Sequence, residues 1–474
     1  MNRFPANYLL VALALLLGGC ATVSKDEAFE DINQDLEQRL GERVHWKQGR
    51  PEDEQVAQRV SDLLAGEISV AQSVQVALLN NPMLQARFED LGIAQANLVQ
   101  AGLLNNPVFH GEIRWPREDE GRNYDLGVSL DFLRILTIPL RRKVAEAGFE
   151  SAKLEVSAAV LDLSAQVRKT FYQAQAATQS VEMMQQVVQS TGAAVHAAER
   201  LHAAGNIPDL RLANQRALHE EARLFLAAAE GVVLAGRERL NVLMGLWGRD
   251  TQWRLAARLP EPPGSDPDLT QIERRAVNSS LELASARLKL QSLAQQLGLD
   301  KNTRLLPEFE LGYAFERDDG EKEDGISLGL QIPLFDYGQA RVARGQARLR
   351  RAQQEYLSTA IQVRSAARLT RESVRLAHAR VNHVRKVMLP LSQQIVDESL
   401  LSYNAMQIGV FRLLRAQERQ IALGQRYIEL LRDYWIARAD LDLMLSGRMP
   451  DGGGMLASAT SGDAPMASGN SGGH

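Results

Sequence analysis

The residue best suited to covalent chemistry is Cys20, the one cysteine of the 474-residue chain. It follows Leu-Gly-Gly at the end of a short apolar stretch that begins at Tyr8, and Arg3 is the only charge before it. This arrangement is typical of a bacterial lipobox, in which the thiol is acylated and the preceding peptide is removed. We predict a lipoprotein signal peptide over 1–19 and a lipid anchor, palmitate among its acyl chains, on Cys20; a chance cysteine in an ordinary export signal is the alternative.

The residues after Cys20 indicate the membrane to which the anchor is sorted. Lipoproteins kept in the inner membrane usually have Asp directly after the cysteine, whereas here Ala21 and Thr22 follow it. No later apolar run approaches the length of about 18 residues that a membrane-spanning helix needs. We therefore expect a lipid-anchored chain at the cell outer membrane that extends into the periplasm, with any membrane crossing made by strands.

Motifs for other chemistry are missing from the sequence. It contains no P-loop, G-x-S-x-G, H-E-x-x-H or dinucleotide fingerprint. His196 and His202 lie on different faces of a predicted helix, and Met183 and Met184 are the only adjacent methionines. One cysteine excludes a Cys-based zinc site and a disulfide framework. We predict that the protein is not an enzyme and that it holds no metal and no cofactor.

Composition narrows the fold class and the partners. The chain has 54 basic and 58 acidic residues, a formal net charge of −4, which gives no electrostatic support for nucleic-acid binding. Aromatic residues make up only 5% of the chain, while Ala, Leu, Gln and Arg are plentiful. This composition favours a mainly α fold with a small β part.

Four short segments alternate strictly between apolar and polar residues. We predict strands over 107–115, 124–132, 307–316 and 325–332, paired through charged loops at 117–122 and 317–324. Aromatic residues recur on the apolar face, where we expect them to face lipid: Phe109, Trp115, Tyr124, Phe132, Phe309, Tyr313 and Phe315. One apolar and one polar face is typical of a membrane β-barrel with water inside, although a half-buried hairpin packed on helices alternates in the same way.

The number of strands sets a condition on such a barrel. The smallest single-chain barrels have about eight strands, so the four predicted strands cannot close one alone. Several copies of the chain would have to share the barrel, and three copies would supply twelve strands. The alternation therefore predicts an oligomer wherever it predicts a membrane barrel.

The strands belong to an internal tandem repeat. Residues 69–246 and 268–446 follow one plan at a spacing of about 200 residues, and Ile-Pro-Leu stands at both 138–140 and 332–334. A proline-rich connection that no helix could cross separates the two repeats. The remaining segments are an N-terminal periplasmic segment, this linker and a Gly- and Ser-rich tail predicted to be disordered, at 20–68, 247–267 and 447–474.

Long helices make up the rest of each repeat. The segments 141–204 and 336–404 contain Pro390 as their only proline, and their apolar residues recur at heptad spacing. At ~1.5 Å rise per residue, about 64 residues form a helix of about 96 Å, far longer than a compact domain requires. Each segment ends in a turn, at 204–209 and 404–409, and a returning helix follows. The sequence therefore predicts two long antiparallel helical hairpins.

Four stretches of the sequence have counterparts in a known family. They are Ala-Leu-Leu-Asn-Asn-Pro, Gly-Leu-Leu-Asn-Asn-Pro, Ala-Gly-Asn-Ile-Pro and Ile-Pro-Leu-Phe-Asp, at 77–82, 102–107, 204–208 and 332–336. In this order, with their duplication and the lipobox, they resemble the outer membrane efflux protein family, the TolC-like outer membrane factors, in a lipoprotein member. The resemblance covers about residues 44–447. It implies a homotrimer whose twelve-stranded transmembrane β-barrel, with four strands from each chain, is continued by a long periplasmic α-helical barrel.

The resemblance also implies where partners bind. The two turns would form the periplasmic tip, where a periplasmic adaptor protein and an inner-membrane pump of the RND or ABC type engage the channel. The tip residues are Gly205, Asn206, Ile207, Pro208, Gln407, Ile408 and Gly409. Alignment to the family places Arg412 and Arg415, with Asp209 nearby, at the pore constriction of the closed end, where arginines would favour anions; the alternative is that they pair with residues such as Glu418.

Two functions remain open from the sequence. The first is the outer-membrane channel of a tripartite efflux or secretion system, a passive trimeric conduit opened by an adaptor and a pump. The second is a lipid-anchored periplasmic coiled-coil adaptor or scaffold protein. An adaptor is expected to have one long hairpin flanked by other modules, whereas here two hairpins each follow their own strand pair. This organisation favours the channel, and the residues do not indicate its cargo.

Overall fold

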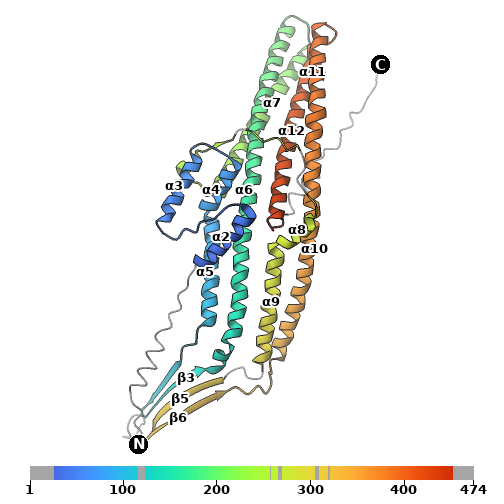
Figure 1. The fold of residues 1–474 in the computed structure, drawn as a ribbon. Helices are drawn as coiled ribbons and strands as arrows, with labels where there is room; N and C mark the ends of the chain where they lie inside the picture. The colour runs from blue at the N-terminus through green and yellow to red at the C-terminus, as the bar shows by residue number, and fades with distance from the viewer. Residues whose placement is uncertain are drawn as a thin grey trace. The chain divides into compact units, whose positions relative to one another are not determined.

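The computed structural model describes residues 26–115, 123–256, 258–264, 269–304, 309–318 and 321–451 (Figure 1). They form two compact units. Unit 1 comprises the described residues of Met1–Gln34, Arg87–Val156 and Leu283–Thr359, and unit 2 comprises those of Asp35–Ala86, Ser157–Glu282 and Ala360–His474. The predicted lipidation site at Cys20, the loop at 117–122 and the tail beyond 451 lie outside the described residues.

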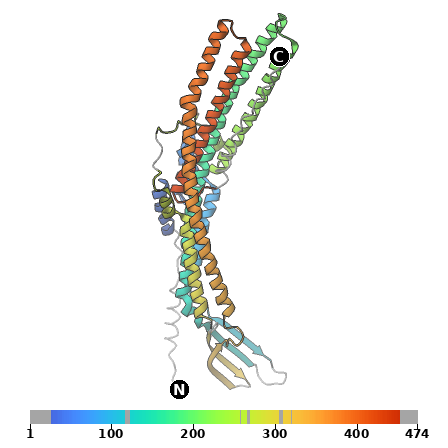
Figure 2. The ribbon, with the colours of Figure 1, turned by 90° about the vertical axis from the view of Figure 1, so that its right-hand side faces the viewer.

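Unit 1 contains a four-stranded antiparallel sheet in the order β2-β3-β5-β6 (Figure 2). Its strands are β2 (Val108–Arg114), β3 (Asn123–Asp131), β5 (Phe309–Asp318) and β6 (Glu321–Leu330). Four helices flank the strands along the chain: α5 (Pro82–Gly102), α6 (Phe132–Ala203), α9 (Leu281–Asn302) and α10 (Gln339–His383). All four predicted strands are therefore present, each pair followed by a long helix.

The strand boundaries differ from the prediction in their details. β5 and β6 extend through the charged segment predicted as a loop, with Arg317 opposite Lys322 in the ladder. Side chains at 321–324 are exposed, so their charges stay hydrated while the backbone keeps its ladder hydrogen bonds. β6 ends at Leu330, before Pro333, which has no N–H to extend the ladder.

The first long helix begins earlier than the predicted 141. α6 starts at Phe132, directly after β3, and includes Pro139. The Asp131 carboxylate accepts a hydrogen bond from the Arg134 backbone N–H at 3.0 Å, as a helix-capping side chain does. This capping contact explains why Phe132, predicted as the last strand residue, is the first helical one.

The second long helix is interrupted close to Pro390. α10 passes into the short π-helix η2 (Val384–Met388), and α11 (Leu389–Asn404) follows with Pro390 in its first turn. Proline lacks an N–H and its ring conflicts with the carbonyl one turn earlier, so a local change in helix geometry accommodates it. Heptad spacing indicated the apolar positions but not this interruption.

Unit 2 is mainly helical. Besides parts of the long helices, it contains α3 (Glu52–Leu64), α4 (Val70–Asn80), α7 (Asp209–Met244), α8 (Ile272–Ser279), α12 (Val410–Leu445), the 3-10 turn η1 (Gly248–Thr251) and the end of α2 (Asp26–Leu40). A two-residue strand β1 (Glu67–Ile68) pairs in parallel with β4 (Arg254–Leu255). The core includes these fully buried side chains: Phe171, Leu240, Met244, Tyr434 and Leu441. None of the helices in the described part of the chain has an apolar stretch sufficient to span a membrane.

The segment around Pro260 and Glu261, which the sequence predicts as a linker between two repeats, is hydrogen-bonded to helices of unit 2. The Trp435 indole donates to the Pro260 carbonyl at 2.7 Å. The Glu261 carboxylate accepts from the Arg385 guanidinium at 3.0 Å and from the Tyr427 hydroxyl at 2.7 Å. Burial raises the pKa of Tyr427, and the hydrogen bond to Glu261 raises that pKa further. The linker thereby connects α12 to η2.

Ordered contacts continue past the predicted start of the tail at 447. The Arg448 guanidinium lies 2.8 Å from the Asp162 carboxylate and 3.0 Å from that of Glu282. The hydrogen bond to Asp162 is the main reason that the pKa of Arg448 is raised. These ion pairs fix the segment after α12 to α6 and α9, because Arg448 satisfies two carboxylates at once.

Two glycines close equivalent junctions in unit 2, after α7 and after α12. Gly245 has φ +66° and Gly447 has φ +103°, both in the region that favours glycine. A Cβ on Gly245 would lie 2.6 Å from the Asn80 carbonyl oxygen, and one on Gly447 would lie 2.1 Å from that of Ser279. Conformation and close backbone approach therefore both require glycine here.

We expect Gly245→Ala to lower the free energy of unfolding by about 1–3 kcal/mol, because strain at positive φ adds to the contact with the Asn80 carbonyl. Gly231→Ala is the matched control, since Gly231 lies within α7 and a Cβ there meets nothing within 4 Å. That control should be neutral or stabilising by up to about 1 kcal/mol. Thermal unfolding followed by circular dichroism measures the stability of both variants. Equal melting temperatures for the two variants would contradict the requirement for glycine at position 245.

Candidate functional site

The apolar face of the sheet is built from cross-strand rows, because directly opposed residues of an antiparallel pair point to the same side. One row contains Phe109, Val128, Tyr313 and Ile326. Ile326 is 79% exposed and Leu328, on the same face, is 63% exposed. A hairpin packed on helices requires a covered apolar face, and the described residues of unit 1 leave these side chains uncovered.

Five of the seven predicted lipid-facing aromatic residues lie near the ends of the strands, whereas Phe109 and Tyr313 lie in the row between them. Tyr124 stacks on Phe315 near the hairpin loops, with ring centroids 6.0 Å apart. Phe132 meets Phe309 edge-on at 5.9 Å, where strands give way to helices. Trp115 directly follows β2 and is exposed. Aromatic side chains near both ends of the strands are expected at the two membrane–water interfaces of a barrel. Contact with lipid stays a prediction.

The polar face carries a row of four carboxylates that sequence reasoning missed. Glu112, Asp125, Glu316 and Glu323 stand opposite one another across the four strands. The Arg114 guanidinium lies 3.3 Å from the Glu316 carboxylate and offsets part of the repulsion between like charges. Alternation assigns Glu112, Asp125 and Glu316 to the polar face, whereas Glu323 lies in the segment predicted as a loop. Only the pairing register reveals that all four lie at one level. A face with this many charges requires water.

The first predicted tip is a tight turn between α6 and α7. The backbone N–H groups of Gly205 and Asn206 donate to the carbonyls of His202 and Leu201, each at 2.8 Å. With Gly205 at φ +75°, this is the Schellman motif that ends many helices. Pro208 follows in an extended conformation (φ −76°, ψ 159°) and α7 begins at the next residue. The predicted glycine and proline therefore occupy the positions that their conformations suit.

The second tip, between α11 and α12, repeats this geometry with different residues. The N–H groups of Met406 and Gln407 donate to the carbonyls of Tyr403 and Ser402, each at 2.9 Å. Gly409 has φ −76° and ψ 157°, nearly identical to the proline of the first turn. The two turns are therefore the same backbone motif, although little of their sequence is shared.

Met406 is a tip residue that the sequence interpretation omitted. It takes the left-handed place of the first turn's glycine, with φ +58°, and its side chain is 94% exposed. This conformation is uncommon for a residue with a Cβ, and it presents an apolar side chain at the apex of the turn. Placing the second turn on the first with Met406 opposite Gly205 would have identified it.

The proposed constriction residues lie close to the tips. Arg412 and Arg415 are exposed on the first turns of α12, and neither has an ion pair among the described residues, Glu418 included. The Asp209 carboxylate lies 2.6 Å from His202 Nε2, across the first turn. The Arg211 guanidinium lies over the Phe411 ring at 5.7 Å, so the two tips are in contact. The lining of a pore by these residues stays a prediction.

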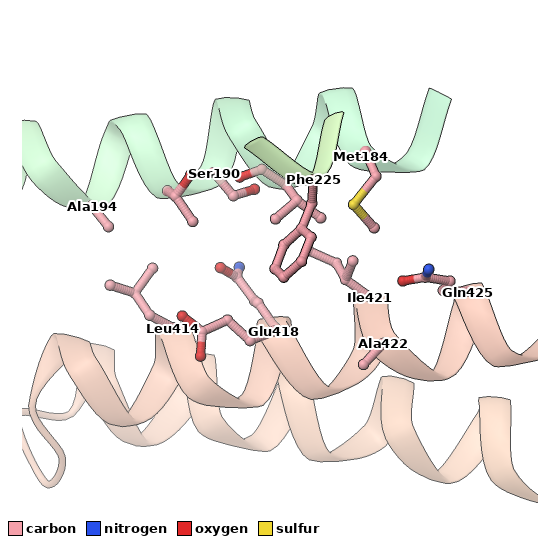
Figure 3. Close-up of a pocket in the computed structure, with 12 residues that line it drawn as sticks. Met184, Ser190, Ala194, Phe225, Leu414, Glu418, Ile421, Ala422 and Gln425 are labelled. Carbon is pink, nitrogen blue, oxygen red and sulfur yellow. Dashed lines mark hydrogen bonds between the residues drawn. The ribbon is translucent and has the colours of Figure 1, made fainter. Parts of the chain in front are cut away.

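An apolar groove in unit 2 lies between α6 and α12, with Phe225 of α7 projecting into it (Figure 3). Its volume is about 190 Å³. Met184 and Ala194 come from α6, whereas Leu414 and Ile421 come from α12. The groove therefore joins the two hairpins some turns away from their tips.

Comparison with known proteins supports the resemblance. Residues 73–246 match the family described as outer membrane efflux protein. The cobalt-zinc-cadmium resistance protein CzcC of Cupriavidus metallidurans is 24% identical over 313 residues, which cover 64% of this chain and 72% of that protein.

Solved structures share the fold. The CmeC outer membrane channel of Campylobacter jejuni matches with a TM-score of 0.69 at 16% identity, covering 82% of this chain and 88% of that one. The MtrE outer membrane channel of Neisseria gonorrhoeae, in its open state, matches with a TM-score of 0.64 at 16% identity, covering 80% of this chain and 89% of that one. The sequence match over residues 73–246 and the shared fold agree, and both make the chain similar to the outer membrane efflux protein family.

Proposed function

We propose that the protein is the outer-membrane channel of a tripartite efflux system, a passive conduit without enzymatic activity. The observation that carries this proposal is the sheet of unit 1, which has an exposed apolar face and a charged opposite face. β2 and β6 are its terminal strands, and each has one unpaired edge within the described chain. Such edges call for partner strands. Three copies joined edge to edge would supply twelve strands. The resulting barrel would have its apolar face toward lipid on the outside and its charged face toward water on the inside.

The relatives support the same role. CmeC and MtrE are named as outer membrane channels, and CzcC is named as a metal resistance protein. Strands of 7 to 10 residues approach the length of about 9–11 residues that a tilted transmembrane strand needs. The lipid anchor at Cys20 would add a second attachment to the same membrane. The alternative, an adaptor or scaffold protein, offers no reason for an uncovered apolar sheet face.

The test of the proposal is conductance in a planar lipid bilayer. Purified protein is expected to insert as a homotrimer and produce discrete current steps, because a hydrated lumen lined by the carboxylate row conducts ions. Protein that remains peripheral to the bilayer and produces no steps would favour the scaffold reading.

The hairpin tips are the proposed docking site for the periplasmic adaptor, through which an inner-membrane pump of the RND or ABC type opens the duct. Support comes from the shared turn motif, the contact between the two tips and the exposed side chain of Met406. An exposed apolar side chain held in a rigid turn is a suitable anchor for a partner helix.

If Arg412 and Arg415 line the pore, the open channel should have a measurable preference for anions. Three copies would place six guanidinium groups near the closed end, which attract anions and repel cations. We expect Arg412→Glu combined with Arg415→Glu to shift the reversal potential of the open channel toward cation preference. Arg364→Glu with Arg380→Glu is the matched control on α10, because both arginines are exposed and distant in sequence from the tips. An unchanged reversal potential would remove Arg412 and Arg415 from the pore.

A further inference from the structure

Exposed apolar side chains continue the apolar face of the sheet beyond the ends of the strands in unit 1. After β6, Ile332, Leu334 and Phe335 are all exposed, and Phe335 reaches 92%. After β3, the first turns of α6 expose Phe132 and Leu136. An exposed apolar segment therefore follows β3 and β6, where strand gives way to helix.

Basic side chains follow these apolar segments on both helices. Arg142 and Lys143 lie on α6, and Arg344 and Arg348 lie on α10, all exposed. At ~1.5 Å rise per residue, they lie within about 17 Å of the start of their helices. That places each cluster one to three turns beyond the apolar segment.

Other charges close to these four residues are paired with one another. Arg341 lies 3.9 Å from Asp300, and Lys289 lies 2.9 Å from Glu355, where α9 and α10 pack together. No ion pair involves any of the four basic residues among the residues that the structure describes. Their charge is therefore not used to hold the fold together and is available to an external anion.

We infer that the two clusters, Arg142 with Lys143 and Arg344 with Arg348, bind the phosphate groups of anionic phospholipids in the leaflet facing the helices. The inference rests on the proposed function, because it requires the sheet to sit in a bilayer. Apolar and aromatic side chains at an interface, followed by long basic side chains that reach the headgroups, are a recurrent device of membrane proteins. Each basic residue near an anionic surface contributes about 1 kcal/mol, equivalent to roughly a fivefold preference.

A lipid surface fits this arrangement better than a soluble anion or a protein. A free phosphate would not need the apolar side chains beside it. The clusters occur after both strand pairs, so a closed barrel would carry them repeatedly around its rim, where lipid surrounds it on all sides. The headgroup layer is about 5–7 Å thick on each side of the hydrocarbon core, and flexible Arg and Lys side chains can reach it from these positions.

The experiment compares lipid selectivity in reconstituted protein. Electron spin resonance of spin-labelled phosphatidylglycerol and phosphatidylcholine gives their relative association with the protein surface. We expect phosphatidylglycerol to be preferred, and Arg344→Gln with Arg348→Gln to lower that preference by about fivefold or more. Arg142→Gln with Lys143→Gln should act similarly. Arg364→Gln with Arg380→Gln, the same charge change farther along α10, should leave it unchanged.

A separate readout distinguishes failure of this inference from failure of the proposed function. Trp115, at the far end of β2, should be quenched by brominated acyl chains if the sheet is inserted, and Trp115→Phe identifies its share of the signal. Quenching without phosphatidylglycerol preference, or with equal loss in the control variant, overturns the headgroup site alone. Absence of quenching of Trp115 overturns insertion itself, and the headgroup site with it.

Discussion

Leu328→Arg is expected to prevent stable insertion of the protein in the outer membrane, whereas Ser327→Arg should be tolerated. Leu328 lies in the second half of β6 on the exposed apolar face, opposite Leu311 and within the run of exposed apolar side chains from Ile326 to Leu334. A charged side chain at the bilayer midplane of a barrel costs about 2–4 kcal/mol, and a trimer would carry three copies of it. Ser327 is one residue away on the polar face, so its replacement adds charge to the same strand without exposing it to lipid.

The measurement is the amount of heat-resistant oligomer in outer-membrane fractions. The two variants should separate clearly, with the Leu328 variant strongly depleted and the Ser327 variant close to wild type. If the strands formed a soluble half-buried hairpin, neither Leu328 nor Ser327 would face lipid. The abundance of the two variants would then not depend on which side of the strand faces lipid. Equal abundance of both variants would therefore contradict the assignment of the apolar face to lipid.

A second large effect is expected at the first tip. Gly205→Val combined with Pro208→Phe should leave the oligomer assembled but uncouple it from the pump. A β-branched residue at φ +75° is strained by about 1–2 kcal/mol, and we expect this strain to deform the turn. A Cβ at Gly205 would meet no other atom within 4 Å, so the substitution does not disturb neighbouring residues. A loss of about 1.4 kcal/mol in docking free energy weakens coupling tenfold.

The readout of the tip variant is export in a strain where the wild-type chain restores it, together with oligomer abundance. Gly148→Val is the matched control, because Gly148 is exposed on α6 and also has open space around it, but has ordinary helical geometry. Normal export by the tip variant would exclude docking at this turn. Loss of oligomer in the tip variant would instead assign the turn to assembly.

The sequence was most informative where a local rule decides the structure. Strict alternation located β2, β3, β5 and β6, because side chains in a strand change face at every residue. The glycine and proline of the first turn indicated its position, since each suits one backbone conformation. The sequence also placed the second turn correctly, although Met406 there adopts a conformation that its residue type does not favour.

Other features depend on contacts between distant residues and were not visible in the sequence. The early start of α6 follows from one cap at Asp131. The carboxylate row from Glu112 to Glu323 exists only through the register of three strand pairs. The π-helix near Pro390 and the fastening of the linker by Glu261 likewise arise from packing. Sequence periodicity indicates the face of a strand or helix on which a residue lies. It does not indicate which residue of the neighbouring strand stands opposite, or which distant residue the side chain contacts.

The central claim, that several copies of this chain form one hollow conduit, is tested most directly by electron microscopy of the detergent-extracted protein. We predict a hollow cylinder with threefold symmetry, whose helical part is on the order of 100 Å long. Single solid rods or compact monomers would contradict the shared barrel, and a lipid-anchored scaffold would then be the better account of the chain.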